Sequence, residues 1–503
     1  MEHTFVALPD KYEKVVLVDG NGKAARHVLW GDWLWIDENK PDNDPQWRHV
    51  VWSPNDPEKR RELRILRSHT IDSRPLEIIF VDVGQGDASV LVTPERDSRE
   101  RIIVIDAGLG DEMGEFLDER FKAYQKAMTF YAAVITHPDE DHYLGFRPIF
   151  ASGKIKFRFC YHSGLVERAV PGKFEKAGGL TPGAQAGEEF LEALVETDAE
   201  FRQLFSGPTN RMRYPGMIKE ALDNVAVGEF SMLSTAHGTF EDDKTWMPGF
   251  APSDERDYSI EVLGPFVEQG PNGPRLRRIG DYGETKNGRS VLLRLCFNNF
   301  RILFGGDLNR PAEQFLLKKY AGIESWPATP AERKAMIDAV RPRFRSEVLK
   351  VCHHGSSDVT DEFLEAVDPA AFVISSGDQE GHVHPRPDLL GRLGRKGRGD
   401  SPVLLSTELQ RSTRAREDER LSKQLKTDIA DQIAGPTPER QTSINEIIKS
   451  LSRSNVDVDG AIYVKTDGQR LIAAFKKETA SETDKWFYFE YRMTGGELVL
   501  VRR

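Results

Sequence analysis

The sequence predicts a layered α/β protein whose functional site lies where several strands end. Apolar runs rich in Val, Ile and Leu recur along the chain, and each is bounded by Gly, Asp or His, as buried strands are. Segments with helical patterns lie between these runs. Because the ends of such strands meet at one edge of a sheet, polar residues that follow them are expected to converge on a common site.

Size and composition indicate a soluble globular protein with more than one domain. The chain has 503 residues, of which 39% are hydrophobic and 30% charged, and its formal net charge is -11. This length exceeds what one ordinary core supports, so two or three domains are expected. The acidic charge counts against a large nucleic-acid surface, although it is compatible with a local basic groove.

The sequence also predicts a cytoplasmic protein without a membrane segment. No run of about 18 apolar residues is present. The segment MEHTFVALPDKYEK lacks the basic start and apolar core of a signal peptide. Three sparse cysteines, Cys160, Cys296 and Cys352, are typical of reduced thiols.

Three domains are expected along the chain. Residues 1–73 are predicted to form a small β module, because KVVLVDGNGKAARHVLWGDWLWIDE alternates apolar and polar residues around a DGNG turn. This Trp-rich module resembles an SH3-like barrel. Residues 74–400 form the main domain, and residues 401–503 a C-terminal extension that is partly helical. The strands of the extension, with TDG as a turn, are candidates to complete the main fold.

The main domain has a regular succession of predicted elements. Buried strands are expected in LEIIFVDV (76–83), RIIVIDAG (101–108), YAAVITH (131–137), SVLLRLCFNNFRILFGGD (290–307), SEVLKVCHHG (346–355) and AAFVISSGD (370–378). DEMGEFLDERFKAYQKAM (111–128) is predicted to be a helix. The strand pattern stops between about residues 165 and 255, where helices are expected over 188–205 and 216–226. We interpret this segment as a helical insertion, which is either a lid near the site or a group of solvent-exposed helices on the surface.

The stretch ITHPDEDHYLG carries the strongest chemical signal. His137, Asp139, Asp141 and His142 follow an apolar strand with short spacers, so that one turn can direct them at one point. Imidazole and carboxylate together suit a transition-metal ion such as Zn or Mn. Chance or a capped helix would be the alternative explanation for this stretch alone.

Later strand ends carry further candidate ligands. Asp307 follows one apolar run, His353 and His354 follow another, and His382 and His384 follow a third. So many strands ending in Asp or His are difficult to explain by solvation. Taken singly, His382 is expected to be a surface residue and His354 an orienting group behind the site.

The motif order resembles the metallo-β-lactamase superfamily. The motifs are DVGQGDA, IDAG, THPDEDHYLG, NGRSVLLRL, FGGDLN, VCHHGSSD and SSGDQEGHVHP, and they resemble most the ComEC-like branch, the hydrolase domain of bacterial DNA-uptake proteins. The resemblance covers about residues 76–395 apart from the insertion, and reaches 476 if the TDG hairpin closes the main fold. It implies a four-layer αββα sandwich with a dinuclear metal site at one edge of its two sheets.

The resemblance also implies a role for each matching residue. His137 and Asp139 correspond to ligands of a first metal ion, Asp141 and His142 to ligands of a second, Asp307 to a carboxylate that bridges both, and His353 to a late histidine ligand. Asp106 corresponds to a structural carboxylate behind the site, and Asp82 and Asp87 to supports of the loop near it. Most superfamily members have His where Asp139 stands and another His ligand further on; here His162 and His237 lie in that region, and whether His162 supports or contacts a metal stays open.

The implied activity is metal-dependent hydrolysis of a phosphodiester, with two divalent ions, Zn or Mn. Asp141 would orient or deprotonate the attacking water, and His384 would either donate a proton to the leaving oxygen or shape the site wall. DNA is the substrate that the resemblance implies, and the basic residues Arg392, Arg395, Lys396 and Arg398, which follow His384, could contact its phosphates. A second basic group comprises Arg275, Arg277, Arg278 and Arg289.

Three alternatives remain open at this point. The basic groups could be solvated surface, and the substrate could be a small phosphodiester reached beneath a lid. The chain could also be a non-catalytic module that binds protein partners through its terminal domains, although the near-complete ligand set argues against that. β-Lactam hydrolysis is disfavoured by Asp139 and the missing middle histidine.

Overall fold

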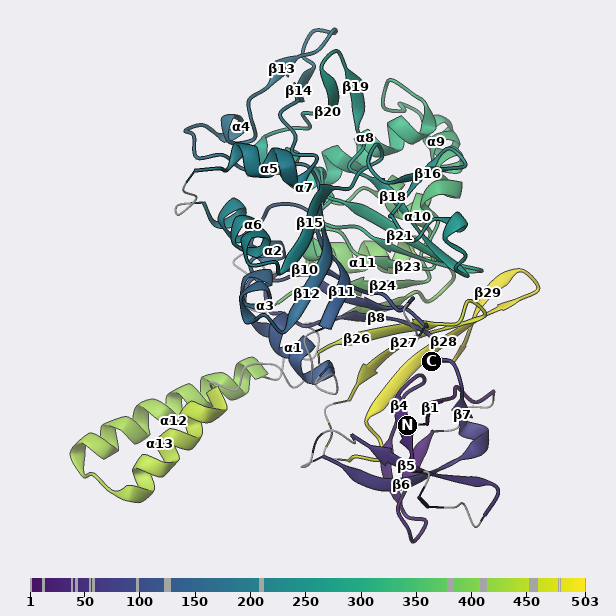
Figure 1. Ribbon diagram of the computed structural model, residues 1–503, viewed down its shortest axis with the longest axis vertical. Helices are drawn as coiled ribbons and strands as arrows, with labels where there is room; N and C mark the ends of the chain where they lie inside the picture. Colours follow the sequence, from purple (N-terminus) through teal and green to yellow (C-terminus); the bar gives the residue numbers. More distant parts are fainter. Residues whose placement is uncertain are drawn as a thin grey trace.

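The chain folds as a mixed α/β protein with several β-sheets (Figure 1). The computed structural model describes all residues except 1, 11–13, 38, 41–43, 54–55, 57–58, 96–98, 122–127, 208–211, 378–383, 408–413, 452–459, 478, 480 and 503. Within this part of the chain, two large sheets contain every strand that the sequence predicted for the main domain.

The first large sheet joins strands from the main domain and the C-terminal extension. Its described strands, in spatial order, are β15 (Val227–Met232), β12 (Ile155–His162), β11 (Met128–Ile135), β10 (Ile102–Ala107), β9 (Ala88–Val92), β8 (Leu76–Phe80), β26 (Ile462–Thr466), β27 (Arg470–Lys476), β28 (Trp486–Thr494) and β29 (Glu497–Arg502). Strands β10, β11, β12 and β15 run parallel, so their carboxyl ends lie along one edge. The hairpin β26–β27 extends the sheet by pairing with β8.

The second large sheet holds the later predicted strands. Its order is β16 (Thr239–Glu241), β17 (Lys244–Trp246), β18 (Tyr258–Gly264), β21 (Leu292–Phe297), β22 (Phe300–Phe304), β23 (Val348–Lys350), β24 (Ala371–Ile374) and β25 (Val403–Ser406). Strands β22 to β25 are parallel, so the residues that follow them also share an edge.

Alternating side chains divide the apolar core of these sheets. On β8, Ile78 and Phe80 join a cluster that contains residues of both large sheets, and the Phe80 and Phe304 rings lie 6.0 Å apart between centroids. Ile79 points into a second cluster, which includes residues of helices α1 (Glu112–Arg120), α3 (Phe146–Ser152), α5 (Asp198–Leu204) and α6 (Arg213–Asp223). Leu303 of β22 lies in a third, with α8 (Arg310–Ala321), α9 (Pro330–Phe344), α10 (Asp361–Val367) and α11 (Pro387–Lys396). This two-residue alternation is the pattern of strands buried on both faces.

The segment predicted as a helical insertion has mixed structure, which corrects the prediction. Helix α6 lies where expected, but the predicted helix over 188–205 is strand β14 (Glu189–Leu191), a loop and α5. Phe190 and Leu191 pair with β20 (Gly273–Arg277), far away in the sequence, and this pairing overrides the local helical pattern. Thr197 then caps α5 by accepting a hydrogen bond from the Glu200 amide.

The same segment contributes other short elements. Strands β13 (Thr181–Pro182) and β19 (Glu268–Gly270) complete a small sheet with β14 and β20, and helix α4 (Lys173–Lys176) lies nearby in the chain. Strand β15 leaves the segment to join the first large sheet. A short 3-10 turn occurs in this segment at Pro252–Asp254. Two others occur elsewhere, at Arg67–His69 before the main domain and at His353–Gly355 after β23.

The N-terminal residues form their own sheet. Its described strands are, in order, β3 (Ala24–His27), β2 (Val16–Val18), β6 (Arg61–Leu66), β5 (Trp47–Trp52), β4 (Trp33–Ile36), β1 (His3–Val6) and β7 (Thr70–Ile71). The hairpin expected around DGNG is β2–β3. The sheet contacts the C-terminal strands: Lys465 donates to the Trp30 carbonyl at 2.6 Å, and the Trp486 amide donates to His27 Nδ1 at 3.2 Å.

The C-terminal extension also contains two long helices. Helices α12 (Arg414–Ala434) and α13 (Pro438–Leu451) form a hairpin that projects away from the body of the protein (Figure 1). The helical part predicted for residues 401–503 therefore lies within a projecting arm. Among the described helices, none combines the length and apolarity needed to cross a membrane.

Candidate metal centre

Asp106 anchors the loop that follows β11. It is the second-last residue of β10 and has a left-handed conformation, with φ of 55°, which is unusual for a residue other than glycine. Its carboxylate accepts hydrogen bonds from the Thr136 amide at 2.8 Å and from the Thr136 hydroxyl at 2.7 Å. The same carboxylate lies 2.8 Å from Nδ1 of His142. One buried side chain thus positions both the start and the end of the HPDEDH turn.

Three buried histidines are oriented in the same way. Nδ1 of His142 faces Asp106, and Nδ1 of His137 lies 3.3 Å from the Ser290 hydroxyl. Nδ1 of His354 lies 3.2 Å from the Ser375 carbonyl. In each ring, Nε2 is buried without a hydrogen-bond partner. Metal-binding histidines have this arrangement, since the bond at one nitrogen fixes the ring and leaves the other for the ion.

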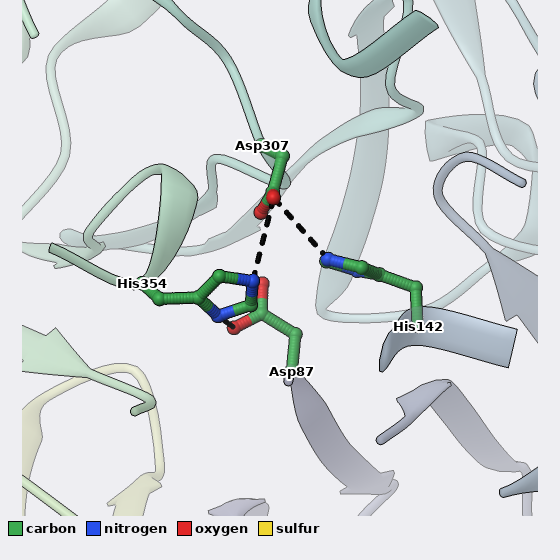
Figure 2. Close-up of side chains that lie close together, drawn as sticks. All are labelled: Asp87, His142, Asp307 and His354. Carbon is green, nitrogen blue, oxygen red and sulfur yellow. Dashed lines mark ion pairs between the residues drawn. The ribbon is translucent and has the colours of Figure 1, made fainter. Parts of the chain in front are cut away.

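The carboxylate of Asp307 lies close to these rings, and Figure 2 shows it beside the rings of His142 and His354. Asp307 Oδ2 lies 3.3 Å from Nε2 of His142 and 3.3 Å from Nε2 of His354. It lies 4.0 Å from Nε2 of His137 and 3.9 Å from Nε2 of His353. Oδ1 of Asp307 is buried and has no hydrogen-bond partner. A carboxylate at the centre of several imidazoles is suited to bridging between cations.

The charges of the cluster are strongly coupled. Burial by itself would raise the pKa of Asp307, but the imidazoles of His354, His142 and His353 hold it well below its usual value. Burial would lower the pKa of His354, whereas Asp307 and Asp141 raise it to about 10. The pKa of His142 is also raised, by Asp307 and Asp106 against burial. The centre therefore favours positive charge, which a divalent ion would supply.

A group of four residues could hold a metal ion. One ligand atom from each of Asp87, His142, Asp307 and His354 lies within 4.8 Å of the others, and all four side chains are buried. Asp87 is also 3.1 Å from Nδ1 of His354 and forms an ion pair with Lys350. Lys350 pairs with Oδ2 of Asp87, whereas Oδ1 lies beside the His354 ring without a hydrogen bond, and this position suits an orienting role for His354.

Asp141 and Asp139 each contact a different buried histidine. Asp141 Oδ2 is 3.4 Å from Nε2 of His354. Burial would raise the pKa of Asp141, but the His354 imidazole helps to hold it below its usual value. Asp139 Oδ2 is 3.4 Å from Nε2 of His137. The other oxygen of Asp139 forms an ion pair with Lys286 of helix α7 (Tyr282–Gly288). The pKa of Asp139 is lowered to about 2, because His137 and Lys286 outweigh the effect of burial.

The two adjacent histidines after β23 differ in their placement. From the sequence, His353 was expected among the ligands and His354 behind them. In the structure, His354 belongs to the buried cluster, and 29% of the His353 side chain is exposed. Both residues have left-handed φ angles, 49° and 53°. Such strained backbone is concentrated at functional sites. The ring of His384 lies 6.1 Å from that of His353 between centroids, on this more exposed side.

Other predicted residues lie away from the cluster. His162 is buried at the end of β12, where its ring stacks on Phe230 at 3.9 Å and its Nδ1 accepts a hydrogen bond from the Gly164 amide. Burial lowers the pKa of His162 to about 3. Asp82 accepts a hydrogen bond from the Gly84 amide in the loop before Asp87. His237 pairs with Glu196 at 2.8 Å. His382 falls outside the described residues.

The predicted phosphate-binding residues are mostly paired with carboxylates. Arg392 lies 2.8 Å from Asp361, Lys396 contacts Glu365, and Arg398 lies 3.1 Å from Glu347. Arg395 is exposed. In the second basic group, ion pairs join Arg277 to Glu268, Arg278 to Glu189 and Arg275 to Glu192, while Arg289 is buried. Neither group offers a broad unpaired cationic surface among the described residues.

Sequence reasoning missed four residues that hold the ligands. Lys350, Lys286, Ser290 and Thr136 each contact a candidate ligand or its support. Only Lys350 had a sequence signal, because a lysine within an apolar run, three residues before two adjacent histidines, is unusual. Lys286 and Ser290 are distant in sequence from Asp139 and His137, which they contact. The contact of Thr136 with Asp106 depends on the geometry of the turn after β11.

Comparisons with known proteins give partial matches. No family model matches the chain. The chain is 31% identical over 124 residues to a Competence protein ComA of Neisseria gonorrhoeae, a match to 24% of this chain and 14% of that protein. It is 27% identical over 112 residues to a ComE operon protein 3 of Bacillus subtilis (strain 168), a match to 22% of this chain and 12% of that protein. The matched segments therefore span about an eighth of these relatives.

A solved structure also overlaps with much of the chain. A mutant of the CmlA beta-hydroxylase aligns over 78% of this chain and 74% of its own length, with 10% sequence identity and a TM-score of 0.30. A TM-score this low does not establish a common fold. The sequence likeness to the competence proteins and the buried Asp/His cluster are therefore the features on which function can be argued.

Proposed function

We propose that this chain is a metallo-β-lactamase-type hydrolase of the ComEC-like branch, which uses divalent metal ions to cleave phosphodiester bonds in DNA. One observation carries the proposal: the Nε2 atoms of His137, His142 and His354 are buried without hydrogen-bond partners and face the carboxylate of Asp307. An unpaired polar atom in the interior costs stability unless a ligand satisfies it. Three such atoms around one carboxylate are best explained by bound cations.

The arrangement of the sheets supports the fold part of this proposal. One apolar cluster contains residues of both large sheets. Two further clusters each combine residues of one large sheet with residues of helices. We interpret this as the four-layer αββα sandwich, with the centre at the carboxyl ends of parallel strands. Residues 401–503 then contribute strands to the sandwich in addition to the projecting arm.

The donor set fits two ion positions that share Asp307. We assign His137, Asp139 and Asp307 to the first position, and Asp141, His142, His354 and Asp307 to the second. Nitrogen and carboxylate donors in this ratio suit Zn or Mn. His354 takes the role of the late ligand because it is buried in the cluster, and the more exposed His353 is left to face a substrate.

The bound ions would lower the pKa of a shared water and neutralise charge on the attacked phosphate. Asp106 keeps the His142 ring in the orientation that presents Nε2, and Asp87 with Ser375 does so for His354. Asp141 stands at the centre to orient a water or take its proton. His384, beside His353, is the candidate proton donor to the leaving oxygen.

A direct assay tests the proposal. Metal-free protein would be reloaded with Mn²⁺ and incubated with linear, circular and single-stranded DNA and with bis-p-nitrophenyl phosphate. Metal-dependent cleavage of DNA is expected, and chelation should abolish it. Cleavage of neither substrate class, after loading has been verified by metal analysis, would refute the hydrolase assignment.

A small phosphodiester is the second candidate substrate. It is favoured by the ion pairs that neutralise Arg392, Lys396 and Arg398, together with the net charge of -11. DNA binding would otherwise need a cationic path along the phosphates. Cleavage of the small ester but of no DNA would select this alternative. The N-terminal sheet and the helical arm are candidate surfaces for protein partners.

A further inference from the structure

A cavity of about 340 Å³ lies between the N-terminal sheet, the first large sheet and helix α1. Its wall includes Trp33 and Trp52 of the N-terminal sheet, Phe116 of α1 and Trp486 of β28. The volume is that of a small-molecule site. Because aromatic rings stack on the faces of other flat rings, aromatic residues from separate elements around such a cavity suit a planar ligand.

The cavity is remote from the metal centre. Glu77, which lines it, is the second residue of β8 and pairs with Val92 of β9. Val92 pairs in turn with Ile102, the first residue of β10, whereas Asp106 lies near the other end of β10. The cavity and the metal centre are therefore at opposite ends of the first large sheet.

The buried residues of the cavity are charged. Glu77 has two cationic partners, Arg120 at 2.8 Å and Lys465 at 2.9 Å. Burial would raise the pKa of Glu77, but Lys465 and Arg120 lower it to about 2. Asp32 is less well compensated, because its Oδ2 accepts from the Leu29 amide at 2.9 Å while its Oδ1 lies 3.7 Å from Nζ of Lys465. Burial raises the pKa of Asp32, and Lys465 offsets this effect only in part.

Asp32 and Lys465 retain hydrogen-bonding capacity. Among the described residues, only the Leu29 amide donates a hydrogen bond to the Asp32 carboxylate. The Lys465 ammonium has three N–H groups, and the Trp30 carbonyl, at 2.6 Å, and Glu77 engage two of them. A donor and a carboxylate oxygen thus stand 3.7 Å apart. A ligand that places an acceptor next to N–H donors would satisfy both.

The more exposed residues of the cavity include cations. Arg26 lies over the Trp52 ring, 4.4 Å from its centroid, and its side chain is 34% exposed. The side chain of Lys59 is 58% exposed. Arg26 pairs with Glu482 and Lys59 with Glu119, and both carboxylates are themselves exposed. Exposed ion pairs are weak, so a phosphate can compete for these cations.

We propose that this cavity binds a guanine mononucleotide, with its base among the Trp rings and its Watson–Crick edge on Asp32 and Lys465. Guanine presents an acceptor, O6, followed by two donors, N1–H and the 2-amino group. Lys465 donates to O6, and Asp32 accepts from the two donors. The phosphate lies at Arg26 and Lys59. Adenine and cytosine place one amino donor beside an acceptor, so neither satisfies Asp32 as fully.

The ligand series gives the expected sizes of the effects. Inosine monophosphate lacks the 2-amino group and should bind about 10-fold more weakly than GMP, because one charge-assisted hydrogen bond is lost. AMP should bind roughly 100-fold more weakly, because it leaves Asp32 and Lys465 without matching groups. Guanosine, which lacks the phosphate, should lose about fivefold, since the cations that it no longer contacts are exposed.

The experiment is isothermal titration calorimetry of the full-length protein with these four ligands, in the presence of a chelator that keeps phosphate from binding through a metal ion. W33L should weaken GMP binding about 10-fold through lost stacking. D32N should do so by about 10- to 100-fold and should remove the preference for GMP over inosine monophosphate.

Two matched variants serve as controls, W35L and D37N. Trp35 lies on the same strand as Trp33, and Asp37 also accepts a backbone hydrogen bond, from the Asn39 amide, but neither residue lines the cavity. GMP should bind to both as it does to the unmodified protein. Thermal melts verify that each variant is folded, and the comparison of GMP with inosine monophosphate needs no variant at all.

The outcomes are distinct from those that test the hydrolase. The affinity order GMP, inosine monophosphate, AMP, with losses in W33L and D32N but not in the controls, supports the site. Absence of GMP binding at millimolar concentrations, equal affinities for GMP and AMP, or equal losses in W33L and W35L would overturn it. GMP binding that requires added Mn²⁺ would place the nucleotide at the metal centre instead and would also overturn it. A protein without hydrolase activity would leave this inference intact.

Discussion

Asp106 and His142 form a buried pair in which the carboxylate lies 2.8 Å from Nδ1 of the ring. The pair directs Nε2 of His142 towards Asp307, 3.3 Å away. The strained φ of Asp106 is maintained by its two hydrogen bonds with Thr136, so that the end of β10 determines the shape of the turn after β11. The carboxylate thus acts on the centre through the histidine that it orients.

This relationship predicts the effect of Asp106→Asn. The amide retains the size of the carboxylate but removes its charge, so that His142 loses the partner that fixes its ring. Mn²⁺ affinity should fall by about 10- to 100-fold, as it does when outer partners of metal ligands are replaced. The circular dichroism spectrum should not change. Asp111→Asn, at an exposed position, serves as the control, and equal affinities of the two variants would contradict the assigned role.

Asp307→Ala tests the bridging carboxylate. Removing it deletes a ligand from both proposed positions, so that bound metal should fall below one ion per chain and hydrolysis should be lost. The fold should be retained, because His142 and His354 can lose their raised proton affinity once the carboxylate is gone. Metal analysis and a thermal melt of the same sample give both answers. An active Asp307→Ala protein would mean that this position was wrongly assigned.

The strand ends of the centre could be predicted from the sequence. His137 and His142 follow the apolar run of β11 in the first large sheet, and Asp307 follows that of β22 in the second; each of these strands has a parallel neighbour. The choice between His353 and His354 could not be predicted. It depends on two left-handed φ angles, and a single residue's shift in that turn exchanges the buried ring for the exposed one.

Long-range pairing explains what the sequence pattern missed. Phe190 lies in a segment with helical periodicity but pairs with Arg277 of a distant strand. Lys286 could not be linked to Asp139 either, because the two are joined only when α7 packs beside the HPDEDH turn. Local patterns predict the elements, whereas the partners of single polar side chains depend on how the two large sheets are brought together.

Arg398 is predicted to contribute to stability more than to DNA binding. Its guanidinium joins Glu347 and Asp368, at 3.1 and 3.0 Å. Arg398→Ala leaves these carboxylates with one partner fewer and should lower the free energy of unfolding by about 1–3 kcal/mol. Arg395→Ala, at an exposed position, should change stability little. Urea unfolding of both variants checks this difference.

The same two variants test the phosphate path. If Arg395 contacts a phosphate, Arg395→Ala should reduce the slope of log affinity against log salt by about one unit. Arg398→Ala should leave that slope unchanged. Fluorescence anisotropy with labelled DNA across a salt series measures both slopes. If joint replacement of Arg392, Arg395, Lys396 and Arg398 left DNA binding intact, these residues would have no role in substrate binding.

Glu313 is predicted to make the stability of the protein depend on pH. It is fully buried on α8, one of its oxygens accepts a hydrogen bond from the Thr360 amide at 2.5 Å, and the other has no partner. Burial raises the pKa of Glu313 to about 8, against the opposing effect of the Thr360 hydrogen bonds. Between the ordinary value of 4.5 and about 8, the folded protein therefore retains a proton that the unfolded chain has lost.

The sign of the effect follows from this difference in bound protons. Because the folded state binds more protons, the free energy of unfolding should fall as pH rises through this window, by up to about 1.4 kcal/mol per pH unit, and level off above it. Glu313→Gln can still accept from Thr360 but does not titrate, so that its profile lacks this contribution. Urea unfolding of the metal-free protein and of the variant at about pH 5, 6.5 and 8 gives the difference between their free energies of unfolding. The contributions of other titrating groups are the same in both proteins and cancel in this difference. The variant should gain stability relative to the unmodified protein as pH rises, and parallel profiles would show that Glu313 is ionised in the folded state.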